Sequence, residues 1–386
     1  MLNRITAALG LMAIMGGLAD GAHARTPQGA EADSRTAAIE GLVQEEMASR
    51  QIPGLQLAIV KGGEIVFTGA WGQADLGTGE PVTARTVFGV NSISKAFTGV
   101  AAMQLVEAGT LDLEVPVTRY LDGLPSAWGA ITARHILTHT SGLPEIIDDN
   151  TRLIDGLGPE AAWARVQALP LRSVPGTQYA YNQTGYALMG RIIERVSGKP
   201  FVAFVGEGQF DVAGMAQARF GHTADTGPGL APLYTHLTLQ IADMRTVGVE
   251  RSETPFERQE VWPAYMHPMA GVQATATDLA AWVIALQKGQ LVSDRGLEQL
   301  WTPQPLPDGR YGGAGRTVTG YGLGWPVTGR AEHPAITPTG GNRAAIFIYP
   351  EDDLAVIVLT NLLGAAPQSF VDRIAAQYIP GLAGEN

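Results

Sequence analysis

Cysteine is absent from this chain of 386 residues. Its absence excludes a disulfide framework, a zinc site built from thiolates, a thiol nucleophile and lipid attachment through a cysteine. Charged residues are also scarce, at 16% of the sequence, where soluble proteins average about 25%. The fold must therefore be held together by packing alone, without covalent cross-links.

Positive charge is in short supply as well. Lysine and arginine together number 26, against 37 for aspartate and glutamate, which gives a formal net charge of −11. A net-acidic chain without basic runs is a poor candidate for binding nucleic acid or anionic lipid. The hydrophobic fraction of 45% is ample for a large core, and 48 glycines with 24 prolines predict many tight loops. No phosphate loop or dinucleotide fingerprint occurs in the sequence, so we expect no cofactor.

The first residues have the pattern of a secretory signal peptide. Arg4 precedes an apolar stretch over residues 5–18, and residues 22–24 form a small-x-small cleavage site. The stretch is shorter than the roughly 20 apolar residues that a membrane-spanning helix needs. We expect residues 1–24 to be removed and residues 25–386 to form one mature domain, located in the periplasm or secreted. No later segment has the pattern of a membrane span.

Strand patterns lie near both ends of the chain. Two β-rich runs, residues 55–60 and 64–71, flank Lys61-Gly62-Gly63 and predict a hairpin. Strand character returns only after about residue 320 and predicts three further strands, over residues 321–327, 344–349 and 354–360. The segment between the two ends, about 92–309, has mostly helical character.

These patterns predict a fold of the α/β class, of the α+β type. One antiparallel sheet is assembled from about residues 52–91 and 320–386, flanked by helices, with the helical region of about 92–309 along one edge. A hairpin module followed by a separate helical module is the alternative, but two strands alone make a marginal sheet. We expect a site in the cleft where the helical region meets the sheet.

Six helices are predicted from apolar spacing and from start and stop signals. One of them is capped by Thr275 or Thr277, and another is ended by Gly198. The helices are expected over residues 35–50, from Ser92 to Ala108, from Thr132, from Gln183 to Gly198, over 276–288 and over 367–379.

The strongest chemical signal is Ser92-Ile93-Ser94-Lys95. Serine is a weak nucleophile and needs a base within reach. At positions i and i+3 of a helix, Ser92 and Lys95 project from one face, so the amine can lie beside the hydroxyl. The partial positive charge of the helix start, together with partial desolvation, favours loss of the lysine proton. The alternative is a capping serine followed by an incidental lysine.

Residues 87–98, which contain this tetrapeptide, resemble the nucleophile segment of the serine β-lactamase and penicillin-binding protein superfamily. The similarity is greatest to its β-lactamase-related, class C-like branch of serine hydrolases. It implies a β-lactamase/transpeptidase-like fold. Further segments resemble family motifs in the same order along the chain: residues 135–144, 175–177, 179–186, 270–272 with 277–279, 321–325 and 339–342.

The resemblance implies a role for each matching position. Ser92 is then the acylated nucleophile, Lys95 accepts its proton, and Tyr181 shares the proton transfer and helps to protonate the leaving group. The backbone N–H groups of Ser92 and Gly341 form the oxyanion hole. Two preorganised donors of this kind lower a barrier by several kcal/mol. A core tyrosine that opens a helix is the alternative interpretation of Tyr181.

Four further positions are expected to contact substrate. Thr339 and Gly340 belong to the strand that lines the cleft in the family. The family's tyrosine motif usually has Asn two positions after the tyrosine, where this chain has Gln183, preceded by Asn182. Either amide can hydrogen-bond a substrate carbonyl, but the longer glutamine side chain moves the donor.

A second departure concerns charge. Pro338 stands where the family strand motif usually opens with Lys or His. Arg343 can supply the missing cation, or it can be an arginine on a strand surface. Loss of the cation argues against an efficient β-lactamase, whose substrates carry a carboxylate beside the scissile amide.

The predicted function is an exported hydrolase that cleaves an ester or peptide bond of a small molecule, of the esterase or D-peptidase type. The alternatives are a non-catalytic member that binds peptidoglycan or peptide, and a weak β-lactamase. The sequence leaves the oligomeric state open.

Two histidines four residues apart, His135 and His139, could share a helical face as metal ligands. The glutamate expected beside a metalloprotease pair is absent, and the Thr-Ser-Gly that follows is typical of a structural turn. We therefore expect no metal site.

Overall fold

The computed structural model describes residues 27–225, 227–313 and 318–382. The predicted signal peptide over residues 1–24 lies outside the described residues. Within the described ranges, no helix is both long enough and apolar enough to cross a lipid bilayer.

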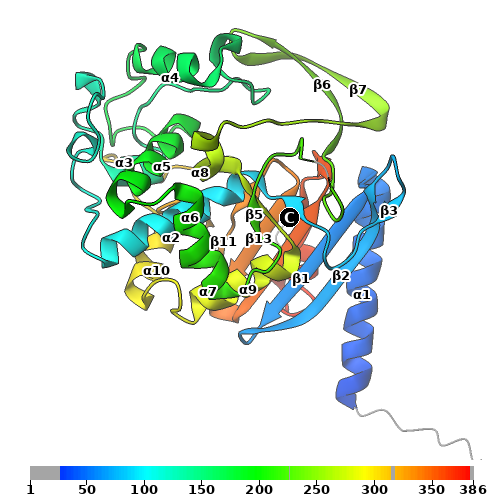
Figure 1. The fold of residues 1–386 in the computed structure, drawn as a ribbon. Coiled ribbons are helices and arrows are strands. Elements are labelled where there is room, and N and C mark those ends of the chain that lie inside the picture. The colour runs from blue at the N-terminus through cyan, green and yellow to red at the C-terminus, as the bar shows by residue number, and fades with distance from the viewer. Residues whose placement is uncertain (1–26, 226, 314–317, 383–386) are drawn as a thin grey trace, which may run out of the picture.

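A large antiparallel sheet forms the centre of the molecule (Figure 1). Along its main path the strands follow the order β3-β2-β1-β14-β13-β11-β10-β9, and β12 pairs with β13. The first strand of the chain pairs with a late one, from Leu55 opposite Thr360 to Lys61 opposite Leu354. The prediction of one sheet built from both ends of the chain is therefore confirmed. The strands are β1 (Gly54–Lys61), β2 (Glu64–Asp75), β3 (Glu80–Pro81), β9 (Gly320–Tyr321), β10 (Pro326–Thr328), β11 (Ala335–Ile336), β12 (Thr339–Gly340), β13 (Ala344–Tyr349) and β14 (Leu354–Thr360).

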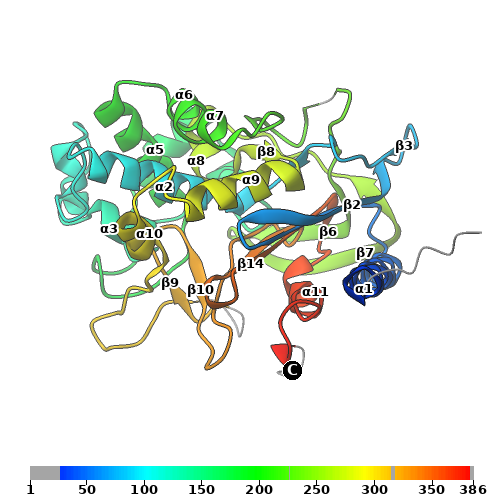
Figure 2. The same ribbon diagram turned by 90° about the horizontal axis from the view of Figure 1, so that it is seen from below.

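The central strands are apolar along their whole length because helices cover both faces of the sheet. Every residue of β13 and β14 is buried. Figure 2 shows α2 and α9 on one side of the sheet and α1 and α11 on the other. The bounds are α1 (Pro27–Arg50), α2 (Ser94–Glu107), α9 (Ala276–Gln287) and α11 (Val371–Ala375). The helix predicted over 367–379 is shorter, with a 3₁₀ turn over Pro367–Ser369 and a break at Phe370 before α11.

The remaining helices gather along one edge of the sheet (Figure 1). Thr132 and Thr275 cap the starts of α3 and α9, and left-handed Gly198 ends α5, as local sequence signals predicted. These helices are α3 (Ala133–Leu137), α4 (Pro159–Gln167), α5 (Gln183–Ser197), α6 (Phe201–Val205), α7 (Asp211–Ala213), α8 (His267–Ala270) and α10 (Asp294–Trp301).

The middle of the chain is less helical than predicted. It contains a long hairpin of β6 (Tyr234–Ala242) and β7 (Arg245–Glu257), to which β15 (Leu362–Leu363) adds in parallel. Leu237, Leu239 and Ile241 alternate with exposed residues along β6, which is the period of a half-covered strand. A third small sheet joins β4 (Phe88–Gly89), β8 (Val272–Ala274) and β5 (Arg219–Phe220).

Candidate active site

Ser92 lies in a 3₁₀ turn, Asn91–Ile93, that leads directly into α2. Lys95 lies in the first turn of α2, and its side chain points back towards Ser92. Its Nζ donates to Ser92 Oγ at 3.2 Å and to the carbonyl oxygen of Met269 at 3.1 Å. The structure thus brings together the two residues that sequence spacing predicted to share one face.

Lys95 is buried in the protein, with 1% of its surface exposed. Burial lowers its pKa from the ordinary value of 10.5 to about 7, while the negative charge of Glu145 acts in the opposite direction. The rings of Tyr181 and Tyr186 lie 4.8 Å and 5.4 Å from Nζ. A large fraction of this amine is therefore neutral near pH 7, as a general base requires.

Tyr181 comes from the loop before α5, and its ring centroid lies 4.8 Å from Nζ of Lys95, the amine that donates to Ser92 Oγ. Its side chain remains 42% exposed, and it lines the same cleft as the serine. Desolvation by the surrounding protein raises the pKa of Tyr181 to about 12. The phenol is therefore protonated at neutral pH and can donate a proton to a departing group.

Strand β12 lies directly against the turn that carries Ser92. A Cβ atom on Gly340 would lie 1.9 Å from the carbonyl oxygen of Val90 and 3.1 Å from the backbone nitrogen of Ser92, so only glycine permits this approach. Gly341 follows with a φ of 56° and lines the cleft together with Ser92 and Thr339. The oxyanion-hole role of the Ser92 and Gly341 backbone remains a prediction.

The cleft has a volume of about 380 Å³ and is mainly aromatic and apolar in character. Pro338 lines the cleft, at the position where the family strand motif usually has Lys or His. No charged side chain is found among the described residues that line it: Ser92, Tyr179, Tyr181, Val318, Tyr321, Gly324, Pro326, Pro338, Thr339, Gly341 and Asn342.

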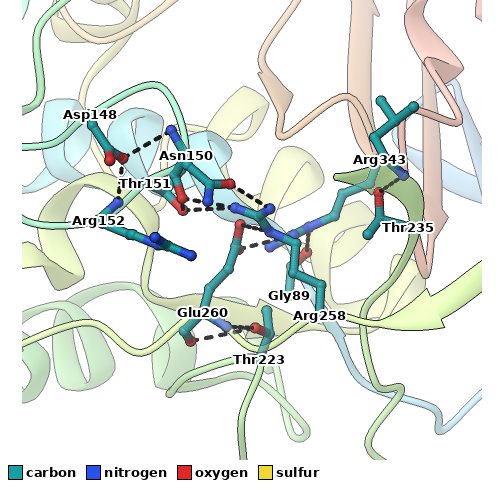
Figure 3. Close-up of polar contacts among 11 residues, drawn as sticks. Gly89, Asp148, Asn150, Thr151, Arg152, Thr223, Thr235, Arg258, Glu260 and Arg343 are labelled. Carbon is teal, nitrogen blue, oxygen red and sulfur yellow. Dashed lines mark hydrogen bonds and ion pairs between the residues drawn. The ribbon is translucent and has the colours of Figure 1, made fainter. Parts of the chain in front are cut away.

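Arg343 is neither a cation of the cleft nor a surface arginine, so both sequence interpretations are wrong. It is buried, with 2% exposed, and its guanidinium is ion-paired with Glu260 at 3.1 Å. Its Nε donates to the carbonyl oxygen of Gly89, at the end of β4 (Figure 3). Glu260 also accepts from Arg258, which follows β7, so the pair joins the hairpin to the sheet.

The side chains of Asn182 and Gln183, the two amides after Tyr181, lie in different surroundings. The prediction that Asn182 contacts substrate is wrong, because its side chain caps α5. Asn182 Oδ1 accepts from the N–H of Gly185 at 2.8 Å, and Nδ2 donates to the carbonyl oxygen of Leu143 at 3.0 Å. Gln183 instead lines a second cavity of about 430 Å³, which shares Tyr181 with the cleft.

A family model described as Beta-lactamase matches residues 39–379. The chain belongs to the beta-lactamase family. Its fold is likewise that of solved relatives: a penicillin-binding protein homologue from Pyrococcus abyssi superposes with a TM-score of 0.72 at 26% identity, over 91% of this chain and 78% of that one. That protein is described as octameric.

Curated relatives of several kinds share sequence with this member of the family. Penicillin-binding protein 4* of Bacillus subtilis is 27% identical over 75% of this chain and 63% of its own length. A Beta-lactamase of Escherichia coli is 26% identical over 81% and 85%, respectively. Esterase EstB of Burkholderia gladioli is 28% identical over 45% and 49%. The match thus spans less than two thirds of the first of these relatives.

Glu145 is a site residue that sequence reasoning missed. Its carboxylate accepts from the backbone N–H of Gln183 at 3.0 Å and from the N–H of Ile146 at 2.9 Å. Its negative charge raises the pKa of Lys95 and thereby moderates the effect of burial. Burial in turn raises the pKa of Glu145 itself. A signal was present, since Glu145 directly follows the family-like motif over residues 135–144.

Proposed function

We propose that this protein is a serine hydrolase that cleaves esters or amides with an uncharged, largely apolar acyl group through an acyl-enzyme on Ser92. The observation that carries the proposal is the contact of Ser92 Oγ with a buried amine whose pKa is lowered to about 7. Family membership and the esterase, β-lactamase and penicillin-binding relatives support a hydrolase of the serine type.

The first half-reaction acylates the enzyme. Neutral Lys95 accepts the Ser92 proton while Oγ attacks the substrate carbonyl, and the oxyanion is held by the backbone N–H groups of Ser92 and Gly341. Collapse of the tetrahedral intermediate breaks the ester or amide bond. The leaving oxygen or nitrogen takes a proton from Tyr181, which is then restored from Lys95. The products are an ester on Ser92 and the released alcohol or amine.

The second half-reaction releases the acyl group. A water molecule gives one proton to the Lys95–Tyr181 pair and attacks the acyl carbonyl. The resulting intermediate expels Ser92 Oγ, which takes the proton back. The enzyme returns to its starting state, and a carboxylic acid leaves the cleft.

Cleft chemistry favours neutral substrates. A substrate carboxylate finds no cation among the described lining residues, and Pro338 offers neither charge nor proton. Tyr179, Tyr321 and Val318 provide surface for an apolar acyl group. Esters and D-peptidase-type amides therefore come before β-lactams. Export to the periplasm or to the medium, through removal of residues 1–24, is part of the proposal.

A substrate panel tests this order. Turnover of p-nitrophenyl acetate and butyrate, D- and L-alanine p-nitroanilide and nitrocefin is measured for the wild type and for Ser92→Ala. We expect the esters and the D-alanine anilide to be hydrolysed faster than nitrocefin, and every activity to vanish in Ser92→Ala. Nitrocefin as the best substrate would contradict the proposed specificity. Binding of peptidoglycan fragments without turnover, unchanged in Ser92→Ala, would instead identify a non-catalytic binding protein.

A further inference from the structure

His139 lies directly beside Tyr181 and holds the backbone on both of its sides. The N–H of Ala180 donates to the carbonyl oxygen of His139 at 2.8 Å. The N–H of Asn182 donates to the ring Nδ1 of His139 at 3.0 Å. One histidine therefore fixes the residue before and the residue after Tyr181, which lines the cleft beside Ser92.

The imidazole also supports the phenol ring itself. The ring centroids of His139 and Tyr181 are 4.3 Å apart, and their planes are tilted by 37°. Tyr186 and Tyr321 enclose the imidazole further, at 5.0 Å and 4.7 Å. With 1% of its surface exposed, His139 has no room to change its orientation.

The hydrogen bonds define the protonation state of His139. Because Nδ1 accepts from a backbone N–H, the ring proton lies on Nε2. That nitrogen is buried, and no described residue forms a hydrogen bond with it. Burial and the nearby Lys95 hold the pKa of His139 well below its usual range, so the ring is neutral.

The backbone of His139 has a φ of 57°, in the left-handed region that disfavours most side chains. An unsatisfied buried N–H and this backbone conformation each cost free energy. An apolar residue would fill the same space without a buried unsatisfied N–H, so packing alone does not require a histidine here. A role for the Nδ1 acceptor explains why a histidine occupies this position.

We propose that His139 is a positioning residue that holds Tyr181 in contact with the Ser92–Lys95 pair. The inference rests on the proposed hydrolase function and adds a determinant of its proton transfer. His135, one helical turn earlier, provides the contrast. Its Nδ1 accepts from the N–H of Thr132 at 3.3 Å and completes the capping box of α3. Within the described part of the chain, no hydrogen bond or ring contact joins His135 to Tyr181.

Two substitutions separate the Nδ1 acceptor from the bulk of the ring. In His139→Asn, the side-chain oxygen lies near the former Nδ1 position, and asparagine tolerates a positive φ. In His139→Gln, the amide lies near the former Nε2 position instead. We expect H139N to keep kcat for a p-nitrophenyl ester within about threefold of wild type, and H139Q to lose about 10- to 100-fold in kcat with KM nearly unchanged.

A double-mutant cycle tests whether the effect passes through Tyr181. In a Tyr181→Phe background, H139Q should lower kcat by less than about threefold, because the phenol is already absent. His135→Gln is the matched control, and we expect it to lower the melting temperature and to leave kcat unchanged. Equal loss in H139N and H139Q, full activity in H139Q, or losses that multiply in the Tyr181→Phe background would each overturn the proposal.

Amide hydrogen exchange keeps this inference distinct from the proposed function. Exchange at the Asn182 N–H should be faster in H139Q and remain protected in H139N, whether or not the protein turns over any substrate. If the wild type has no hydrolase activity but this exchange pattern is seen, the proposed hydrolase function is refuted, and the hydrogen bond between His139 and Asn182 is still supported. An active wild type whose Asn182 exchange is unaffected by H139Q would refute the positioning role alone.

Discussion

Two buried basic side chains, Arg343 and Lys95, contact the segment from Gly89 to Ser92, and their surroundings differ. Arg343, behind Gly341, has a carboxylate partner in Glu260 at 3.1 Å. The two hydrogen bonds of Lys95 go to the hydroxyl of Ser92 and to the carbonyl oxygen of Met269. Arg343 is therefore neutralised within the protein, whereas Lys95 is left to lose its proton.

The difference shows how one region of a protein can keep one basic side chain charged and favour the neutral form of another. Burial raises the free energy of a charged side chain, and a carboxylate in direct contact offsets this cost. Without such a contact, burial lowers the pKa of a lysine. Arginine stays protonated in either setting, so it suits the structural position. Lysine can become neutral, so it suits the site of proton transfer. From the sequence, Lys95 was predicted to be the base and Arg343 to be either a cation of the cleft or a surface arginine.

The largest expected effect comes from Lys95→Met. Without the base, kcat should fall by about 10²- to 10⁴-fold. The same change should raise the free energy of unfolding at pH 7, by about 2–4 kcal/mol, because the folded protein no longer holds a desolvated amine. Ester hydrolysis and thermal melts measure the two quantities.

Lys95→Arg is the control for charge. Arginine keeps the positive charge but does not deprotonate, so this variant should be as inactive as Lys95→Met and should not gain its stability. An active Lys95→Arg would show that position 95 contributes charge rather than a base.

Glu260→Gln should have the next largest effect, on stability rather than on chemistry. It leaves Arg343 buried without a counter-charge, which costs about 3–5 kcal/mol. Denaturant unfolding measures the loss. The paired variant, Glu260→Leu with Arg343→Met, removes both charges and should recover part of it. A stable Glu260→Gln variant would show that Arg343 gains little from its partner.

The pH dependence of the wild type sharpens the comparison further. The proposed mechanism requires neutral Lys95, whose folded-state pKa is lowered to about 7. The value of kcat/KM should therefore rise about tenfold per pH unit below pH 7 and level off above it. Stability should rise with pH between the folded value of about 7 and the ordinary value of 10.5, where the unfolded chain binds more protons. A flat rate profile from about pH 5.5 to about pH 8 would contradict a lysine base.

The smallest effect is expected at an exposed ion pair, which serves as a reference for the buried one. Arg165 and Asp155 meet at 3.1 Å with side chains 48% and 51% exposed. Asp155→Asn should change the free energy of unfolding by less than about 1 kcal/mol and leave kcat unchanged. A loss as large as that of Glu260→Gln would remove the distinction between surface and interior on which the comparison depends.

Local signals predicted much of the fold. The apolar runs of β13 and β14 and the caps at Thr132 and Thr275 gave correct elements because each depends on neighbouring residues. The β6–β7 hairpin was missed although Leu237, Leu239 and Ile241 alternate along it. The alternation covers one strand only, in a region otherwise rich in helical patterns.

In the candidate site, too, the residues related by local spacing were predicted, and those that depend on distant partners were not. Ser92 and Lys95 were predicted because one helical turn relates them, and Tyr181 was found through the family resemblance. The position of Arg343 depends on Glu260, which is 83 residues away in the chain, so no local pattern reveals it. The role of Asn182 as a cap depends on its register relative to α5, which sequence spacing fixes only to within a few residues.

Mass spectrometry of a trapped intermediate tests the central claim most directly. The protein is mixed with a p-nitrophenyl ester, quenched in acid within the first turnovers and digested. We predict one acyl group on the peptide that contains Ser92, formed far more slowly in Lys95→Met and absent in Ser92→Ala. Release of p-nitrophenol without an adduct on Ser92, or acylation of Lys95→Met at the wild-type rate, would contradict the account.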